Sequence, residues 1–161
     1  MESSSFLNKL KAEGKLELTE PTEPIADSYE KKSRDCLQAA KLLFNGELYE
    51  NAIGEAYYSM YNAVQSLFFR CGIKCENHSA TAILLKKLFS VDTIYQTFSK
   101  AKEERIDKQY YIISMQIKPV TKESAQALIR ISDSFILEVN SYKRNLKIEE
   151  IDKFRKDFDK L

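Results

Sequence analysis

The chain has 161 residues, 43% of them hydrophobic and 30% charged, a composition that suits one domain with a real core and some length left for tails. Lys and Arg number 25 against 24 Asp and Glu, so no overall charge directs the chain toward nucleic acid or a membrane surface. The three cysteines form an odd set without the look of a disulfide framework, and the start MESSSFLNKL is too polar for a signal peptide. We therefore expect a cytoplasmic protein.

Residues 1–26 are predicted to form an N-terminal extension. A short helix ends near Gly14, and an extended connector follows because Pro21 and Pro24 lie within four residues of each other. The main domain is expected to begin at residue 27, where Asp27 or Ser28 can cap its first helix.

The second long helix of that domain contains AYYSMYNAVQSLFF, residues 56–69, which carry no charge. This stretch is too short to span a bilayer, which needs about 20 apolar residues, so we expect no membrane segment. Its apolar residues recur at steps of three and four and form a wide apolar face. Four neutral polar residues lie on another side: Ser59, Asn62, Gln65 and Ser66. We expect a second subunit to cover part of that side, because burying neutral polar groups costs less than burying charges.

The sequence of the remaining residues predicts further helices and no strands. CGIKCEN is interpreted as a loop, after which Asn77 or Ser79 can cap the helix ATAILLKKLF. Another helix is expected to run to about Ile113, and Pro119 then breaks the chain.

Thr121 can cap the next long helix, and residues 146–161 form an amphipathic helical tail. No segment alternates as a strand between hairpin turns. The predicted fold is all-α: an up-and-down antiparallel bundle of about five core helices over residues 27–145, with a helical extension at each end.

Arg105 takes an unusual position on the predicted helix over residues 91–113. At 100° per residue, Arg105 and Gln109 fall in the centre of an apolar stripe that includes Phe98. A buried charge must be paired or hydrogen-bonded, and Glu55 or the neutral polar residues of the central helix are candidate partners. Arg105 is therefore either a phosphate-contacting or catalytic arginine in a crevice, or a structural arginine that is ion-paired or reaches solvent.

His78 is the single histidine and lies at a predicted helix start. Its ordinary pKa near neutrality suits a general acid or base, but no Ser, Cys or Asp has a spacing that builds a triad with it. A capping or surface histidine is the alternative. Cys71, Cys75 and His78 offer three metal ligands without a second cluster to complete a tetrahedral set, so we expect no metal site.

Three stretches resemble the HEPN domain family. LYENAIGEAYYSMYNAVQSLFFRCGIKCENHSATAILLKKLF resembles its second-helix signature, in which a yxxAxxxAYYxMxxA helix is followed by a Gly-containing loop and then a His that opens the next helix. ERIDKQYY resembles the family's later Arg-x-x-x-Asp-Tyr-like stretch, and KESAQALIRISDSFILEV resembles its last helix. The resemblance covers about residues 27–145.

The resemblance implies a helical bundle that commonly forms a homodimer. It also implies a small stand-alone prokaryotic protein of the kind paired with minimal nucleotidyltransferases in toxin–antitoxin systems. Ribonucleolytic members carry an Arg followed four to six residues later by a His. Arg105 fits the Arg position here, but residues 106–112 contain no histidine. A tyrosine with a pKa of about 10 would be a poor general base at neutral pH.

We therefore expect a non-ribonucleolytic HEPN-like protein, without a cofactor, that binds a nucleotide, RNA or a nucleotidyltransferase partner. Its candidate ligand-binding residues are Arg105, Gln109, Tyr110, Asp107, Tyr58 and Asn62. One alternative is an atypical metal-independent RNase toxin with Arg105 and His78 as candidate catalytic residues. Another is a purely structural helical dimer.

Overall fold

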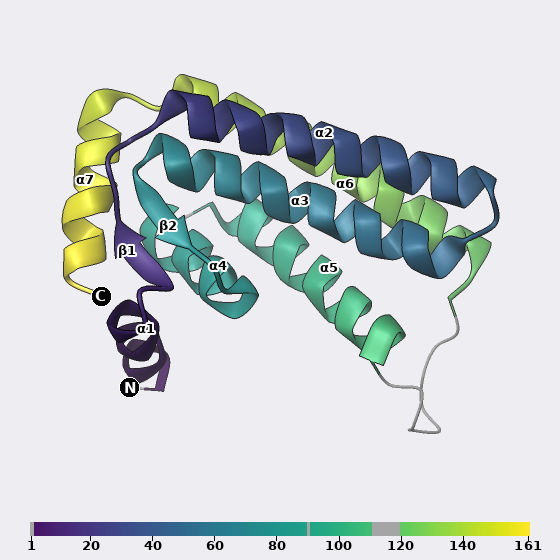
Figure 1. Cartoon of the computed structure of the whole chain (residues 1–161), viewed down its shortest axis with the longest axis horizontal. Helices are drawn as coiled ribbons and strands as arrows, with labels where there is room; N and C mark the ends of the chain where they lie inside the picture. Colours follow the sequence, from purple (N-terminus) through teal and green to yellow (C-terminus); the bar gives the residue numbers. More distant parts are fainter. Residues whose placement is uncertain (1, 90, 111–119) are drawn as a thin grey trace.

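The computed structural model describes residues 2–89, 91–110 and 120–161, and helices dominate all three parts (Figure 1). The helices are α1 (Glu2–Ala12), α2 (Glu23–Asn45), α3 (Tyr49–Arg70), α4 (His78–Leu84), α5 (Asp92–Tyr110), α6 (Lys122–Asn145) and α7 (Ile148–Asp159). A single π-helical turn, Leu85–Phe89, follows α4 directly. Two short strands, β1 (Leu16–Leu18) and β2 (Ile73–Cys75), complete the described elements. The predicted all-α bundle is confirmed.

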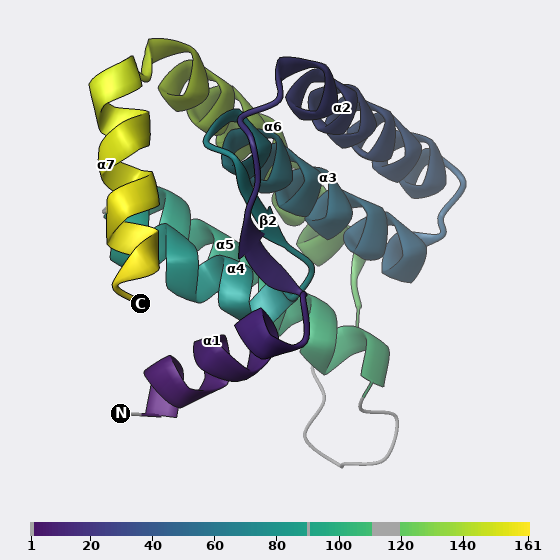
Figure 2. The ribbon, with the colours of Figure 1, turned by 60° about the vertical axis from the view of Figure 1, so that its left-hand side comes forward.

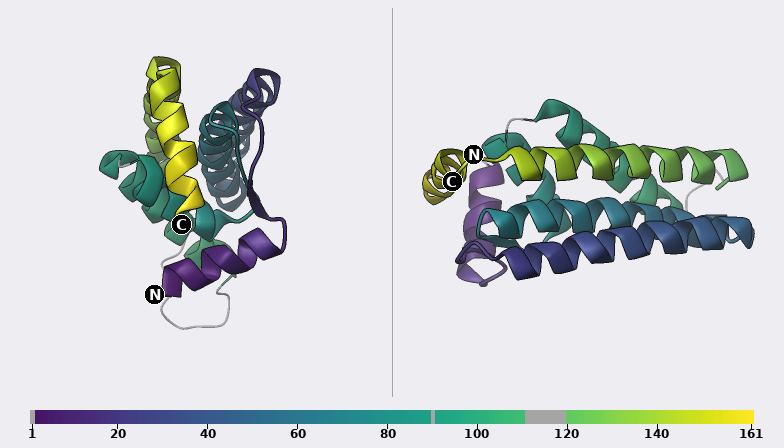
Figure 3. Two further views of the ribbon diagram at one scale, coloured as in Figure 1. Left: turned by 90° about the vertical axis from the view of Figure 1, so that its left-hand side faces the viewer. Right: turned by 90° about the horizontal axis from the view of Figure 1, so that it is seen from above.

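The long helices α2, α3 and α6 lie side by side along the length of the molecule (Figures 1 and 3). Helix α5 packs against both α3 and α6. Helix α7 crosses one end of this bundle, and α1 lies near the C-terminal end of α7 (Figure 2). None of the helices in the described ranges is long and apolar enough to cross a membrane.

Helix α3 is the buried centre of the bundle. Small residues such as Ala52, Ala56 and Ala63 are fully buried on it, and they let neighbouring helices approach closely. The neutral polar side chains at 59, 62, 65 and 66 are also buried, with 0–3% of their surface exposed. The prediction that a second subunit covers part of this side is wrong, because the chain covers these residues itself.

Each of those polar groups has a partner on another element or within α3. The Ser59 hydroxyl donates a hydrogen bond of 2.6 Å to the Ala56 carbonyl, and Asn62 donates one of 2.8 Å to the Tyr58 carbonyl. Gln65 donates to the Thr81 hydroxyl of α4 over 3.4 Å. Polar burial is tolerated here because these groups exchange hydrogen bonds to water for hydrogen bonds within the protein.

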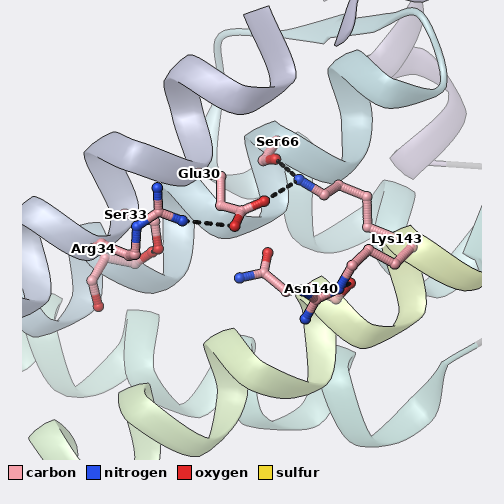
Figure 4. Close-up of polar contacts among 8 residues, drawn as sticks. Glu30, Ser33, Arg34, Ser66, Asn140 and Lys143 are labelled. Carbon is pink, nitrogen blue, oxygen red and sulfur yellow. Dashed lines mark hydrogen bonds and ion pairs between the residues drawn. The ribbon is translucent and has the colours of Figure 1, made fainter. Parts of the chain in front are cut away.

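A three-helix contact joins α2, α3 and α6 through Lys143 (Figure 4). The Lys143 ammonium lies 2.6 Å from a Glu30 carboxylate oxygen and 2.7 Å from the Ser66 hydroxyl, and only 7% of the lysine side chain is exposed. Burial acts to raise the pKa of Glu30, but the hydrogen bond and charge of Lys143, with a smaller effect of Arg34, lower it overall. The Glu30 carboxylate is therefore ionised at neutral pH, and its contact with Lys143 connects three helices.

Helix α2 begins earlier than predicted. It starts at Glu23, with Thr22 before it and Pro24 in its first turn. The predicted caps, Asp27 and Ser28, therefore lie inside the helix. Proline is well placed there, because the first N–H groups of a helix have no partner within the helix in any case. Two other predicted helix starts are confirmed: the Asn77 side chain caps α4, and Thr121 forms a capping box with Ser124 at the start of α6.

The sequence did not predict the two strands. They pair antiparallel with Leu16 opposite Cys75 and Leu18 opposite Ile73, so β2 occupies part of the predicted CGIKCEN loop. Three residues are too few to show an alternating pattern. Gly72 precedes β2 with φ of 68°, and a Cβ there would collide with Arg155 of α7 and the Thr19 carbonyl.

The terminal extensions meet at this end of the bundle. The Arg155 guanidinium donates to the carbonyls of Thr19, Cys71 and Gly72 at 2.6–3.2 Å. Lys11 of α1 donates to the Phe158 carbonyl of α7 over 3.1 Å. Contacts from the two terminal extensions therefore hold the paired strands β1 and β2 against the bundle.

We expect Lys143→Ala to lower the free energy of unfolding at pH 7 by about 2–4 kcal/mol, because the buried Ser66 hydroxyl loses Lys143 and the part-buried Glu30 carboxylate keeps only Arg34. Lys41→Ala is the matched control. It breaks a 2.9 Å ion pair with Asp133 in which both side chains are about half exposed, and should cost about 0–1 kcal/mol. Urea denaturation measures both.

The difference between the two variants should also depend on pH. Because the pKa of Glu30 is lowered in the folded protein, the contribution of the pair is present above the ordinary pKa of a glutamate and is lost as pH falls through the folded pKa. Equal destabilisation by Lys143→Ala and Lys41→Ala at pH 7 would contradict this account.

Candidate functional site

Arg105 lies among aromatic side chains at the junction of α3, α4 and α5. Its Nη2 donates a hydrogen bond of 2.8 Å to the Tyr58 hydroxyl, and its guanidinium carbon lies 4.6 Å from the Tyr58 ring centre and 5.2 Å from that of Tyr57. His78 contacts the same tyrosines and also Tyr61. We call these five residues the Arg105 cluster: Tyr57, Tyr58, Tyr61, His78 and Arg105.

The apolar face of α5 explains why Arg105 points toward α3. Ile94, Phe98 and Ala101 are at most 2% exposed, and the Phe98 ring centre lies 5.7 Å from that of Tyr57. Residues seven apart on a helix share a face, so Arg105 continues this buried stripe two turns beyond Phe98. The predicted position of Arg105 on an apolar face is therefore confirmed.

Among the residues that the structure describes, Glu55 does not pair with Arg105. The Glu55 carboxylate lies instead beside the Cys36 thiol of α2, where burial first and Glu55 second raise the pKa of Cys36 to about 11. Arg105 donates instead to the Tyr58 hydroxyl, and Tyr58 is not one of the four neutral polar residues that were the other predicted partners. Stacking on aromatic rings is a typical arrangement for a weakly hydrated guanidinium.

His78 is held by two contacts at the first turn of α4. Its ring stacks on Tyr61 with the ring centres 4.0 Å apart, and its Nδ1 lies 2.7 Å from the Tyr57 hydroxyl. Burial, followed by the charges of Arg105 and Lys102, lowers the pKa of His78 to about 4. Burial also raises the pKa of Tyr57 above its usual range. At neutral pH the cluster therefore joins a cationic guanidinium to an uncharged histidine and uncharged tyrosines.

The structure brings some of the predicted site residues together and separates others. Arg105, His78 and Tyr58 meet in the cluster, although His78 and Arg105 are far apart in sequence. Asn62 is 3% exposed and lies 3.6 Å from the Cys36 sulfur, on the side of α3 that faces α2. Asp107, Gln109 and Tyr110 belong to α5, and their side chains lie outside the described part of the chain.

The site prediction did not include Tyr57 and Tyr61. Both are in AYYSMY, where positions 57 and 61 are one helical turn apart and therefore share a face. That spacing was a usable signal, but aromatic residues at helical spacing are more often simple core residues. In the fold, the first turn of α4 lies over this face and brings His78 into contact with Tyr57 and Tyr61.

The candidate metal ligands do not form a metal-binding group. Cys71 and Cys75 are buried, and burial is the main cause that raises the pKa of both thiols, that of Cys71 to about 12. His78 is turned toward Tyr57 and Tyr61. Among the residues that the structure describes, no three His, Cys, Asp or Glu side chains are placed to hold a metal ion.

Comparison with known proteins places the chain in a family. The model of the HEPN domain matches residues 26–142, so the chain belongs to the HEPN domain family. A UPF0332 protein of Thermotoga maritima is 28% identical over 67 residues, which are 42% of this chain and 51% of that protein. The chain thus matches about half the length of this curated relative.

We expect the single histidine to titrate near pH 4, well below its ordinary pKa of 6.5. Arg105→Gln should raise this pKa, because it removes the positive charge that opposes protonation more strongly, and Lys102→Gln should raise it less. NMR titration of the imidazole signals measures each shift, without interference from another histidine.

Lys31→Gln, an exposed change on α2, is the control and should leave the titration unchanged. A midpoint near 6.5 in the unmodified protein would show that His78 is neither desolvated nor close to these cations.

Proposed function

We propose that this HEPN protein binds a phosphate-bearing nucleotide ligand, RNA in particular, at the Arg105 cluster, and that it does not cleave it. The observation that carries the proposal is the Arg105 guanidinium stacked on Tyr58 and Tyr57 beside His78. A guanidinium is suited to phosphate oxygens, and aromatic faces are suited to nucleotide bases.

The state of His78 supports binding over catalysis. An imidazole whose pKa is about 4 is not in the imidazolium form at neutral pH and lacks the acidic proton that a leaving group would need, so it is a poor general acid there. It remains an uncharged hydrogen-bonding group next to a cation. The stretch after Arg105 also lacks the histidine that ribonucleolytic members carry.

The biological setting of this binding is proposed on family resemblance. A homodimer and a minimal nucleotidyltransferase partner, in a toxin–antitoxin-like pair, are the arrangement that the resemblance implies. Both are compatible with an Arg105 cluster that binds nucleotides.

We expect Arg105→Gln to weaken binding of a labelled single-stranded RNA by roughly tenfold to a hundredfold, the effect of removing one charge-assisted hydrogen bond. Arg105→Lys keeps the charge but not the planar, stacking guanidinium, so it should restore only part of the affinity. Fluorescence anisotropy at fixed salt measures both variants.

Arg130→Gln removes one positive charge from an exposed position on α6 and is the matched control. If Arg105→Gln and Arg130→Gln bind RNA equally, Arg105 is not part of the binding site. Thermal unfolding of each variant separates loss of binding from loss of fold.

A second candidate function, RNA cleavage, is favoured by the proximity of His78 to Arg105. We expect the purified protein to leave single-stranded RNA intact in the presence of EDTA. Cleavage that disappears in His78→Gln and Arg105→Gln but persists in Arg130→Gln would replace the binding proposal with an RNase. Its rate should then be flat above about pH 4 and fall below it, as His78 becomes protonated and can no longer accept a proton.

A further inference from the structure

A basic pocket lies between the α4 region and α5, next to the Arg105 cluster. Its volume is about 670 Å³, within the range of small-molecule binding sites. Three lysines, Lys86, Lys87 and Lys102, line it together with a single acid, Glu103. The pocket is therefore positively charged in a chain whose overall charge is close to zero.

The pocket and the Arg105 cluster share a border. Ser79 lines the pocket and directly follows His78 in the first turn of α4. The Lys102 ammonium donates to the Ser79 hydroxyl over 2.8 Å, and Lys102 lies three residues before Arg105 on α5. Side chains three apart on a helix are neighbours, about 5–6 Å apart at Cβ. A ligand that lies across His78 would therefore contact both Arg105 and Lys102.

The π-helical turn shapes the wall of the pocket opposite α5. Lys86 and Lys87 are consecutive residues of this turn, and both line the pocket. Short π-helical turns are uncommon and often occur at functional sites. The Lys86 ammonium lies 5.3 Å from the centre of the Tyr95 ring, so the pocket combines an aromatic face with exposed lysines.

We propose that this pocket is a second nucleotide subsite, which holds the part of a single-stranded RNA that adjoins the nucleotide at the Arg105 cluster. Lys86, Lys87 and Lys102 contact backbone phosphates there, and a base takes the place of the Lys86 ammonium on the Tyr95 ring and stacks on it. The inference rests on the proposed function and narrows it: the ligand is an oligonucleotide and not a mononucleotide. An acidic peptide would satisfy the lysines, but aromatic faces in both the pocket and the cluster favour bases.

The test compares an eight-nucleotide single-stranded RNA with AMP on the same variants. Lys86→Gln/Lys87→Gln should weaken the RNA and leave AMP unaffected, whereas Arg105→Gln should weaken both. The double variant should also lower the slope of log affinity against log salt by about 1.4, because each phosphate contact on a single strand contributes about 0.7. Over a fourfold rise in salt, the affinity of the unmodified protein should then fall by a factor about 7-fold larger than that of the double variant.

Lys31→Gln/Lys32→Gln is the matched control, since it removes two consecutive exposed lysines from α2. Tyr95→Leu is a second variant, expected to weaken RNA binding without changing the salt slope, because it removes a stacking surface and no charge. Anisotropy measures RNA binding, and calorimetry measures AMP binding.

Three results would overturn the subsite. If Arg105→Gln weakens both ligands but the two lysine pairs behave alike, the pocket is not on the RNA path, although the Arg105 site stands. If polyglutamate displaces the RNA as effectively as unlabelled RNA does, the lysines form a surface for acidic proteins. If the unmodified protein binds neither RNA nor AMP, the proposed function fails together with the subsite.

Discussion

The structure depends on the burial of α3, a helix that carries polar side chains into the centre of the bundle. Each of these groups must find a protein partner, because burial removes the water molecules that would otherwise hydrogen-bond to it. The Ser59 and Asn62 side chains bond to carbonyls within α3. Other elements supply the remaining partners: Thr81 of α4 contacts Gln65, Lys143 of α6 contacts Ser66, and Ser33 of α2 donates to the Ser59 backbone carbonyl. The hydrophobic effect is non-directional, whereas these hydrogen bonds require particular atoms to meet and so add to the preference for one register. The Lys143 contact adds Glu30 and so fixes α2 and α6 together.

The same helix positions the candidate site. A second face of α3 carries Tyr57, Tyr58 and Tyr61. It contacts the first turn of α4 and the C-terminal half of α5. Because Tyr57 is fully buried, its hydroxyl is held at the distance at which it bonds His78. Tyr58 is more exposed and meets Arg105 through both its ring and its hydroxyl. The site is thus built on rigid helices and on side chains whose positions the core already determines, a condition for precise ligand recognition.

The sequence predicts much of this fold because the relevant signals are local. Helical periodicity, the caps at Asn77 and Thr121 and the position of Arg105 on an apolar stripe all depend on neighbours within a turn or two. The strands could not be predicted, since their pairing joins residue 16 to residue 75 and each has only three residues. The neutral polar residues of α3 indicated that this face is buried, but not that α2, α4 and α6 bury it in place of a second subunit. His78 and Arg105 likewise come together only through tertiary packing, which the spacing of residues along the chain does not predict.

Electrostatics at the cluster favour one kind of ligand. After burial, the charges of Arg105 and Lys102 are what keep His78 unprotonated, so both cations act on the histidine. A phosphate placed beside these cations would reduce that repulsion and raise the pKa of His78. By linkage, protonation of His78 and binding of the anion then favour each other. General acid catalysis at neutral pH would require the bound phosphate to raise the pKa of His78 from about 4 to near neutrality. This electrostatic arrangement supports the proposal that the Arg105 cluster binds a phosphate-bearing ligand without cleaving it.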